Sequence, residues 1–145
     1  LSLACRYLGN CGRSIGQVRR YLERKDATQA AIDAVVAELQ AHGYLDDARF
    51  ARDYVEARRR LDSWGTERLE RRLRTIAVAE EHIATALATR SVDEELDAAV
   101  ALLRRRLRTR LEDDGARQRA LGLLRRRGYP EELAAEAVRA FERDG

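Results

Sequence analysis

Two adjacent aspartates, Asp46 and Asp47, are the residues that most directly decide whether this 145-residue sequence is that of an enzyme. Paired carboxylates act as general acid and base when they face a common pocket and have different pKa values. Asp46 and Asp47, however, are neighbours at the predicted start of a helix, where adjacent side chains diverge. We therefore expect them to cap a helix, and we predict no catalytic residues.

The other residues with reactive side chains are isolated. His42 and His82 fall in different segments without a visible nucleophile, and there is no glycine-rich phosphate loop. Cys5 and Cys11 are six residues apart, with no second pair and no histidine at ligand spacing, so we expect two reduced thiols. The sequence predicts no metal site and no cofactor, and thus a protein that is not an enzyme.

Arginine clusters are the strongest chemical signal that remains. The window from Arg104 to Arg127 holds ten arginines against three acidic residues, although the net charge of the chain is only +3. Such a surface could contact nucleic-acid phosphates or an acidic protein. It could equally be a solvated helix face in an arginine-rich composition. The candidate binding residues are Arg58, Arg59, Arg60, Arg71, Arg72, Arg74, Arg104, Arg105, Arg106, Arg108, Arg110, Arg125, Arg126 and Arg127.

The chain has 45% hydrophobic and 37% charged residues, a composition that predicts a soluble, folded protein. No apolar run approaches the roughly 20 residues needed to cross a bilayer. The N-terminal residues have no basic leader and no long apolar core, so we expect no secretory signal and a cytoplasmic location.

Apolar residues recur with helical spacing along almost the whole chain, and no segment alternates like a strand. One pattern combines Ile32, Val35, Val36 and Leu39, and a longer stripe runs from Leu96 through Leu107 to Leu111. The sequence therefore predicts an all-α fold of about nine helices. Turn chemistry marks their ends: Ser14 with Gln17 as a capping box, Thr28 as a cap, Gly43 and Gly128 as left-handed helix ends, and Pro130 at a helix start.

The apolar pattern repeats every 51 residues. Leu22, Leu73 and Leu124 form one triplet, and Ala27, Val78 and Tyr129 form another five positions later. We infer three tandem three-helix repeats, over residues 1–43, 44–91 and 92–145. Because each repeat would pack mainly on its neighbours, the expected array is elongated and curved, with a long surface for a partner.

Several of these segments resemble the RecX family, regulators of the RecA recombinase. The central signature is GYLDDARFARDYVEAR, which begins at Gly43, continues through Tyr44, Leu45, Asp46, Asp47 and Phe50, and is followed by Trp64 and Gly65. VRRYL from Val18 and LLRRRGYPEELAAEAV from Leu123 resemble the first and last repeats of the family. Two positions depart from the pattern: Ala77 stands where a glycine is usual, and Gln17 stands where glutamate is frequent.

The resemblance implies a monomer that binds the active RecA filament on DNA. It also implies inhibition of RecA's ATPase, strand-exchange and coprotease activities, and thus control of recombinational repair and the SOS response. We expect Tyr44, Leu45 and Phe50 to be core and joint residues, whereas Trp64 is either packed between repeats or exposed to a partner.

Another class of function stays open. Three-helix units with a short turn before the last helix also describe helix-turn-helix DNA readers. The predicted third helices carry few base-reading side chains, so the alternative is a nonspecific DNA-binding helical protein, on single or double strands. A helical scaffold for an unrelated partner is the remaining possibility.

Overall fold

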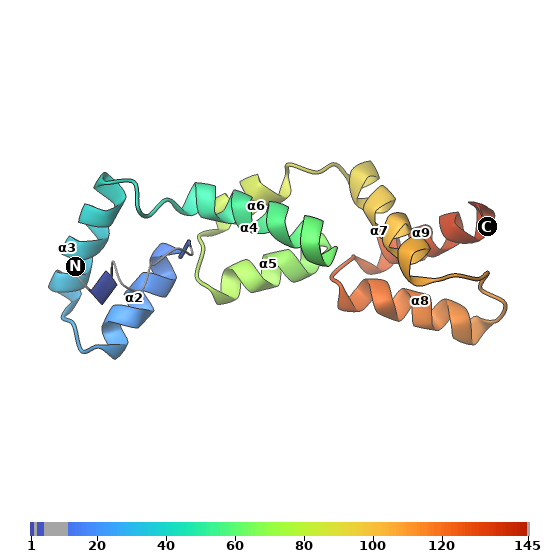
Figure 1. The fold of residues 1–145 in the computed structure, drawn as a ribbon, viewed down its shortest axis with the longest axis horizontal. Coiled ribbons are helices and arrows are strands. Elements are labelled where there is room, and N and C mark those ends of the chain that lie inside the picture. The colour runs from blue at the N-terminus through green and yellow to red at the C-terminus, as the bar shows by residue number, and fades with distance from the viewer. Residues whose placement is uncertain (2, 5–11, 145) are drawn as a thin grey trace. The chain divides into compact units, whose positions relative to one another are not determined.

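The computed structural model describes residue 1, residues 3–4 and residues 12–144, and this part of the chain forms helices and no strands (Figure 1). The all-α prediction is confirmed, whereas the predictions for Cys5 and Cys11 lie outside the described residues. The helices are α2 (Ile15–Arg24), α3 (Gln29–Ala41), α4 (Asp47–Asp62), α5 (Thr66–Thr75), α6 (Glu80–Leu87), α7 (Val92–Arg106), α8 (Asp114–Arg126) and α9 (Glu131–Asp144).

The chain divides into two compact units. Unit 1 consists of residues 1–54 and 72–86, and unit 2 of residues 55–71 and 87–145. Helices α4 and α5 therefore contribute residues to both units. The predicted boundaries of the three repeats and the elongated shape of the array remain predictions.

The same hydrogen bond closes the turn before the last helix of every repeat. The backbone N–H groups of Ala27, Val78 and Tyr129 donate to the carbonyl oxygens of Leu22, Leu73 and Leu124, at 3.1, 3.0 and 3.0 Å. The residue before each donor has a positive φ: 62° at Asp26, 62° at Ala77 and 98° at Gly128. Thus the 51-residue period of the sequence is a period of backbone geometry, and repeated three-helix units are present.

Side-chain caps fix the starts of several helices as the sequence predicts. Ser14 and Gln17 form a capping box at α2, and the Thr28 hydroxyl accepts from Ala31 N at 3.2 Å at α3. Gly43, with φ of 76°, follows the end of α3. Helix α9 begins at Glu131, directly after Pro130.

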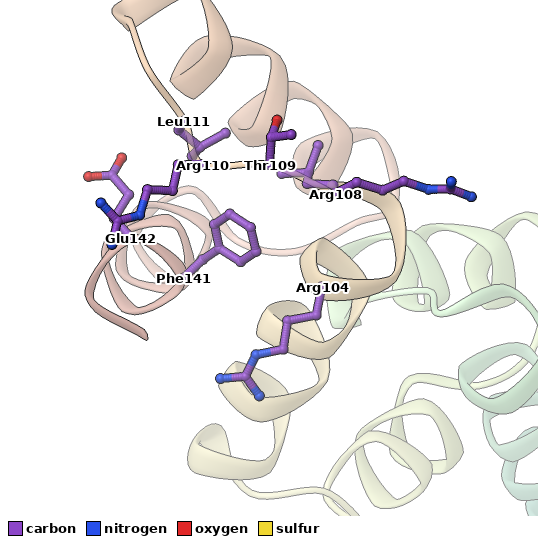
Figure 2. A pocket seen from close by; sticks show the side chains of 8 residues that line it. Arg104, Arg108, Thr109, Arg110, Leu111, Phe141 and Glu142 are labelled. Carbon is purple, nitrogen blue, oxygen red and sulfur yellow. The ribbon is translucent and has the colours of Figure 1, made fainter. Parts of the chain in front are cut away.

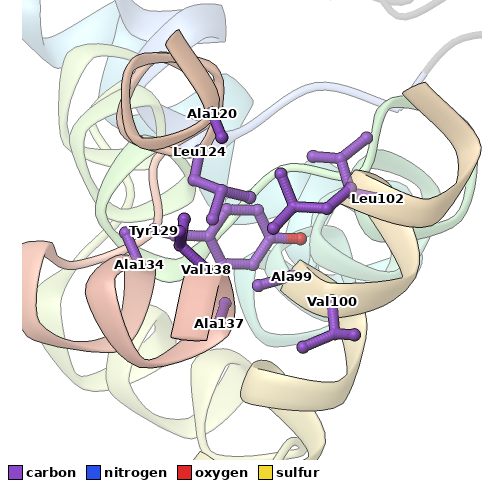
Figure 3. Packing of buried hydrophobic residues seen from close by; sticks show 10 residues of the cluster. Ala99, Val100, Leu102, Ala120, Leu124, Tyr129, Ala134, Ala137 and Val138 are labelled. Atoms are coloured by element: carbon purple, nitrogen blue, oxygen red, sulfur yellow. The ribbon is translucent and has the colours of Figure 1, made fainter. Parts of the chain in front are cut away.

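Each unit has its own hydrophobic core. In unit 1, buried residues of α2 and α3 pack together, among them Val18, Leu22 and Ile32. In unit 2, Leu124 of α8 and Ala137 and Val138 of α9 surround the fully buried Tyr129, together with residues of α7 (Figure 3).

The start of one helix packs closely against a turn of the next repeat, in the same way in both units. In unit 2, Gly65 N donates to Arg127 O at 2.7 Å, and a Cβ at Gly65 would lie 2.6 Å from the carbonyl carbon of Gly128. In unit 1, Ser14 Oγ donates to Ile76 O at 2.7 Å. Ser14 and Gly65 are separated by the repeat period, as are Ile76 and Arg127.

The structure differs from the sequence prediction at the end of α7. The apolar stripe predicts a helix that continues to Leu111, but α7 ends at Arg106 and residues 107–113 form a non-helical connection to α8. Leu107 and Leu111 still pack against the core of unit 2, which explains why their spacing resembles a helix. In the described part of the chain, no helix is both long enough and apolar enough to span a membrane.

Candidate functional site

An arginine-lined cleft of about 380 Å³ lies within unit 2. Its walls come from the end of α4, the turn before α7, the last turns of α7 and the end of α8. Among the residues that the structure describes, no acidic side chain lines it. We call this site the basic cleft, and its arginines are Arg59, Arg60, Arg90, Arg105, Arg106 and Arg127.

Three of these arginines also hold the walls of the cleft in place. Arg59 donates to Thr89 Oγ1 at 2.9 Å and to Leu87 O at 3.1 Å. Arg105 donates to Ser63 Oγ at 2.6 Å, and Arg127 donates to the backbone carbonyl of Asp62. Their positive charges are therefore fixed in position, which reduces the entropy that would be lost when an anion binds.

A buried carboxylate behind the cleft supports Arg90. Glu95 is 5% exposed, and its side chain pairs with Arg90 at 3.1 Å and accepts from the Thr66 hydroxyl. Burial, together with the neighbouring Arg90 guanidinium, lowers the pKa of Arg59 from its ordinary value. Burial also raises the pKa of Tyr129, whose hydroxyl donates to Ser63 O at 2.9 Å.

Arg60 and Arg106 complete the cleft from the exposed ends of α4 and α7. The cleft therefore combines anchored guanidinium groups with two exposed ones. Guanidinium groups bind carboxylates and phosphates through paired hydrogen bonds, so the arrangement can bind an extended anion such as a phosphodiester chain or an acidic protein segment.

The candidate arginines outside the basic cleft have other surroundings. Arg58 pairs with Asp62, Arg74 makes two hydrogen bonds to the Glu80 carboxylate, and Arg125 pairs with Glu67 at 3.1 Å. These are ion pairs on helix surfaces. Arg71, Arg72 and Arg126 are exposed on α5 and α8. Arg104, Arg108 and Arg110 line a second cavity beside Phe141, which we call the Phe141 cavity (Figure 2).

The adjacent aspartates have two separate structural roles in unit 1. Asp46 Oδ1 accepts from Arg49 N at 3.1 Å and so caps its own helix, α4. Asp47 is 8% exposed, and its Oδ1 accepts from Ile15 N, the first residue of α2, at 2.9 Å. Burial, the largest cause, raises the pKa of Asp47, while the bond from Ile15 opposes the shift. The capping prediction is correct, with the difference that Asp47 serves a different helix.

The remaining signature residues are not all core residues. Leu45 is buried, but the Tyr44 side chain is 65% exposed, so the expectation of a core position is wrong for Tyr44. Its backbone belongs to the joint, because Tyr44 N donates to Leu39 O at 2.8 Å. The Phe50 ring stacks on Tyr54 with centroids 5.9 Å apart.

Trp64 lies half-buried within unit 2. The Arg68 guanidinium is 4.2 Å from the centre of its ring, and the Arg58 guanidinium is 6.0 Å away. Cation–π contacts of this kind stabilise a turn without requiring a partner.

Sequence reasoning missed Arg90 and Tyr129 as parts of the cleft, Glu95 as the carboxylate that pairs with Arg90, and Phe141 as part of the second cavity. Arg90 is a single arginine before the Ser91 cap, so no cluster marked it. Within the described residues, no group of three His, Cys, Asp or Glu side chains is placed to hold a metal ion.

Family models match two segments of the chain. Residues 1–39 match the RecX first three-helix domain, and residues 46–87 match the RecX second three-helix domain. Among solved structures, the crystal structure of RecX from Lactobacillus salivarius superposes with a TM-score of 0.82, covering 97% of this chain and 93% of that one. The two sequences are 15% identical, so this match shows the fold alone.

Several curated relatives carry the name Regulatory protein RecX. The relative from Geobacillus sp. (strain WCH70) is 33% identical over 91% of this chain, which spans about half of that protein, 49%. The relative from Mycobacterium avium (strain 104) is 34% identical over 96% of this chain and 82% of its own length. Together with the two domain matches, these similarities show that the chain belongs to the RecX family of regulatory proteins.

Proposed function

We propose that this protein binds the RecA filament on DNA and inhibits its ATPase, strand-exchange and coprotease activities. The observation that carries the proposal is membership of the RecX family, established by relatives that are 33% and 34% identical to this chain over 91% and 96% of its length. The proposed setting is the cytoplasm, where the protein would act as a monomer in the control of recombinational repair and the SOS response.

The basic cleft supports this proposal as a contact surface. A RecA filament on DNA presents phosphates and acidic side chains. The six arginines that line the basic cleft complement both, although one of them, Arg90, is also paired with the buried Glu95. Charge complementarity of this kind mainly raises the rate of association and depends strongly on salt. We therefore assign the basic cleft to the filament contact.

Nonspecific DNA binding without RecA is the second candidate function. If the repeats were helix-turn-helix domains, the third helix of each repeat would be the recognition helix. Their exposed side chains include Asp33 and Glu38 on α3, Glu80 and Glu81 on α6, and Glu131, Glu132 and Glu136 on α9. Because these carboxylates would repel phosphates in a DNA groove, the alternative is restricted to contacts through the arginines of the basic cleft.

The test is a titration of this protein into RecA filaments on single-stranded DNA, with the ATPase rate as the readout. Binding to the same DNA without RecA is measured in parallel at the same salt concentration. We expect the rate to fall at protein concentrations far below those that saturate bare DNA. A rate that falls only where the protein coats bare DNA would favour the second candidate and contradict filament-directed inhibition.

A further inference from the structure

The Phe141 cavity differs in chemistry from the basic cleft. It has a volume of about 510 Å³ and lies between the end of α7, the connection after it and the end of α9, all within unit 2. Figure 2 shows the Phe141 ring standing in the space between the 108–111 segment and Arg104 of α7. Leu107 and Leu111 are the other apolar side chains of the lining.

Phe141 is placed as a platform rather than as a fully enclosed core residue. It is partly buried and packs against the hydrophobic core of unit 2 while it also lines the cavity. One part of the ring is therefore held by the core, and another part faces open space. A ring fixed in this way loses little conformational entropy when a planar group stacks on it.

The charges around the ring are predominantly positive. Arg104, Arg108 and Arg110 contribute three guanidinium groups, of which Arg104 is paired with Asp144 at 2.9 Å. Among the described residues of the lining, Glu142 is the one acidic residue. The Glu142 carboxylate accepts from Arg117 at 2.7 Å, so its negative charge is compensated outside the cavity. In Figure 2 the Arg108 side chain extends away from the ring, which places positive charge at the rim.

We propose that the Phe141 cavity binds the base of an unpaired nucleotide, with the base stacked on Phe141 and the flanking phosphates contacting Arg104 and Arg108. An aromatic ring within a positively charged groove is the combination by which proteins bind single strands without sequence preference. Three apolar side chains suffice for one planar base. They do not form the longer series of anchors that a peptide helix places in a groove.

The end of α7 connects this cavity to the basic cleft. Arg104 lines the Phe141 cavity, whereas Arg105 and Arg106, the next two residues, line the basic cleft. A strand with one base on Phe141 can thus pass its neighbouring phosphates to the basic cleft. This inference rests on the nucleic-acid contact of the proposed function. It adds that the ligand of this cavity is a single strand and not a base-paired duplex.

The test compares two labelled probes of equal length by fluorescence anisotropy with the full chain. One is an oligodeoxythymidylate and the other an abasic oligomer with the same sugar-phosphate backbone and no bases. We expect the intact oligomer to bind at least about fivefold more tightly, the lower end of what one base stacked on an aromatic ring contributes. Phe141→Leu should bring this ratio close to one while the affinity for the abasic oligomer stays unchanged.

Two further variants separate stacking from folding. Phe141→Tyr keeps an aromatic face and should restore the ratio, whereas Phe50→Leu in the aromatic pair of unit 1 should leave it unchanged. A ratio of one in the unaltered protein, or a ratio that survives in Phe141→Leu, would overturn the inference. Weaker ATPase inhibition by Phe141→Leu with an unchanged ratio would also overturn it, in favour of a protein contact. The ratio of the two affinities is measured without RecA. A failure of this inference can therefore be distinguished from a failure of the proposed filament binding.

Discussion

At the scale of single residues, Asp46 and Asp47 are adjacent in the sequence but bond to the first turns of two different helices. Asp46 bonds to Arg49 N in α4, and Asp47 bonds to Ile15 N in α2. The first turns of both helices belong to unit 1. The carboxylate of Asp47 therefore joins two segments that are 32 residues apart in the chain.

Substitution of Asp47 tests this joint. Asp47→Ala should lower the free energy of unfolding by about 1–3 kcal/mol, because Ile15 N loses its partner in a partly buried position. Asp47→Asn retains an acceptor oxygen at the same place and should remain within about 1 kcal/mol of the unaltered protein. Urea unfolding followed by circular dichroism measures both changes. Equal stability of the alanine variant and the unaltered protein would exclude the role of Asp47 as a joint.

The raised pKa of Asp47 predicts the direction of its pH dependence. The folded state keeps the Asp47 proton to a higher pH than the unfolded state, so the contribution of this group to stability is greatest at low pH and decreases as the pH rises above 3.8. The melting temperature of the unaltered protein relative to Asp47→Asn should therefore fall between pH 3 and pH 6. An opposite slope would mean that the bond from Ile15, and not burial, dominates the titration.

At the scale of secondary-structure elements, the turn before the last helix of each repeat is the recurring structure. The three turns share their hydrogen bond and their positive φ, although the residue with that φ is aspartate, alanine or glycine. A left-handed conformation costs a non-glycine residue about 1–2 kcal/mol. Ala77 is therefore strained in a turn whose geometry is nevertheless formed.

Exchange of residues between two equivalent turns should have opposite effects. Ala77→Gly should raise the free energy of unfolding by about 0.5–1 kcal/mol, since the relief of strain exceeds the added entropy of the unfolded chain. Gly128→Ala should lower it by about 1–3 kcal/mol, because the new Cβ would lie 2.3 Å from Arg68 Cβ at a φ of 98°. Thermal unfolding measures the change in stability of each variant relative to the unaltered protein. A lower stability of Ala77→Gly would contradict the strain inferred at this turn.

Local sequence signals predict these elements well, because each depends on neighbouring residues. The Ser14 cap and the glycine after α3 are each contained within a few positions of one helix or turn. The contacts between repeats are different. Neither the bond from Ile15 to Asp47 nor the packing of Gly65 on Gly128 has a local signature, because each depends on tertiary packing of distant segments.

The same reasoning explains the two wrong predictions at the level of elements and residues. Leu107 and Leu111 have helical spacing because they face the core of unit 2, but they do so from a connection after α7. Tyr44 is apolar enough for a core, yet its side chain is exposed. The arginine clusters were recognisable in the sequence. Which arginines share one cleft could not be predicted, because the fold brings together helix ends that are distant in the chain. The arginines of the cleft are Arg59, Arg60, Arg90, Arg105, Arg106 and Arg127.

At the scale of the whole molecule, the location of positive charge matters more than the net charge of +3. If the basic cleft binds the filament, reversal of two exposed arginines there should weaken binding more than the same change elsewhere. Arg60→Glu with Arg106→Glu alters the cleft, and Arg52→Glu with Arg139→Glu is a control with equal net charge at exposed positions outside it. Both double variants should keep the helical circular dichroism spectrum.

Salt dependence gives an independent prediction for the basic cleft. Each arginine that contacts a phosphate or carboxylate adds to the decrease of affinity with ionic strength. The affinity of the cleft double variant for the RecA filament should therefore depend less steeply on salt than that of the control double variant. Parallel slopes in titrations between low and physiological salt would argue that the cleft makes no direct contact with charged groups.

The most direct measurement is the protein concentration that halves the ATPase rate of RecA filaments on single-stranded DNA, determined for the unaltered protein and for both double variants. We predict inhibition by the unaltered protein and the control at similar concentrations, and a concentration at least about tenfold higher for the cleft variant, which corresponds to about 1.4 kcal/mol. Inhibition at equal concentrations by all three would contradict the assignment of the basic cleft, and no inhibition by the unaltered protein would contradict the proposed function itself.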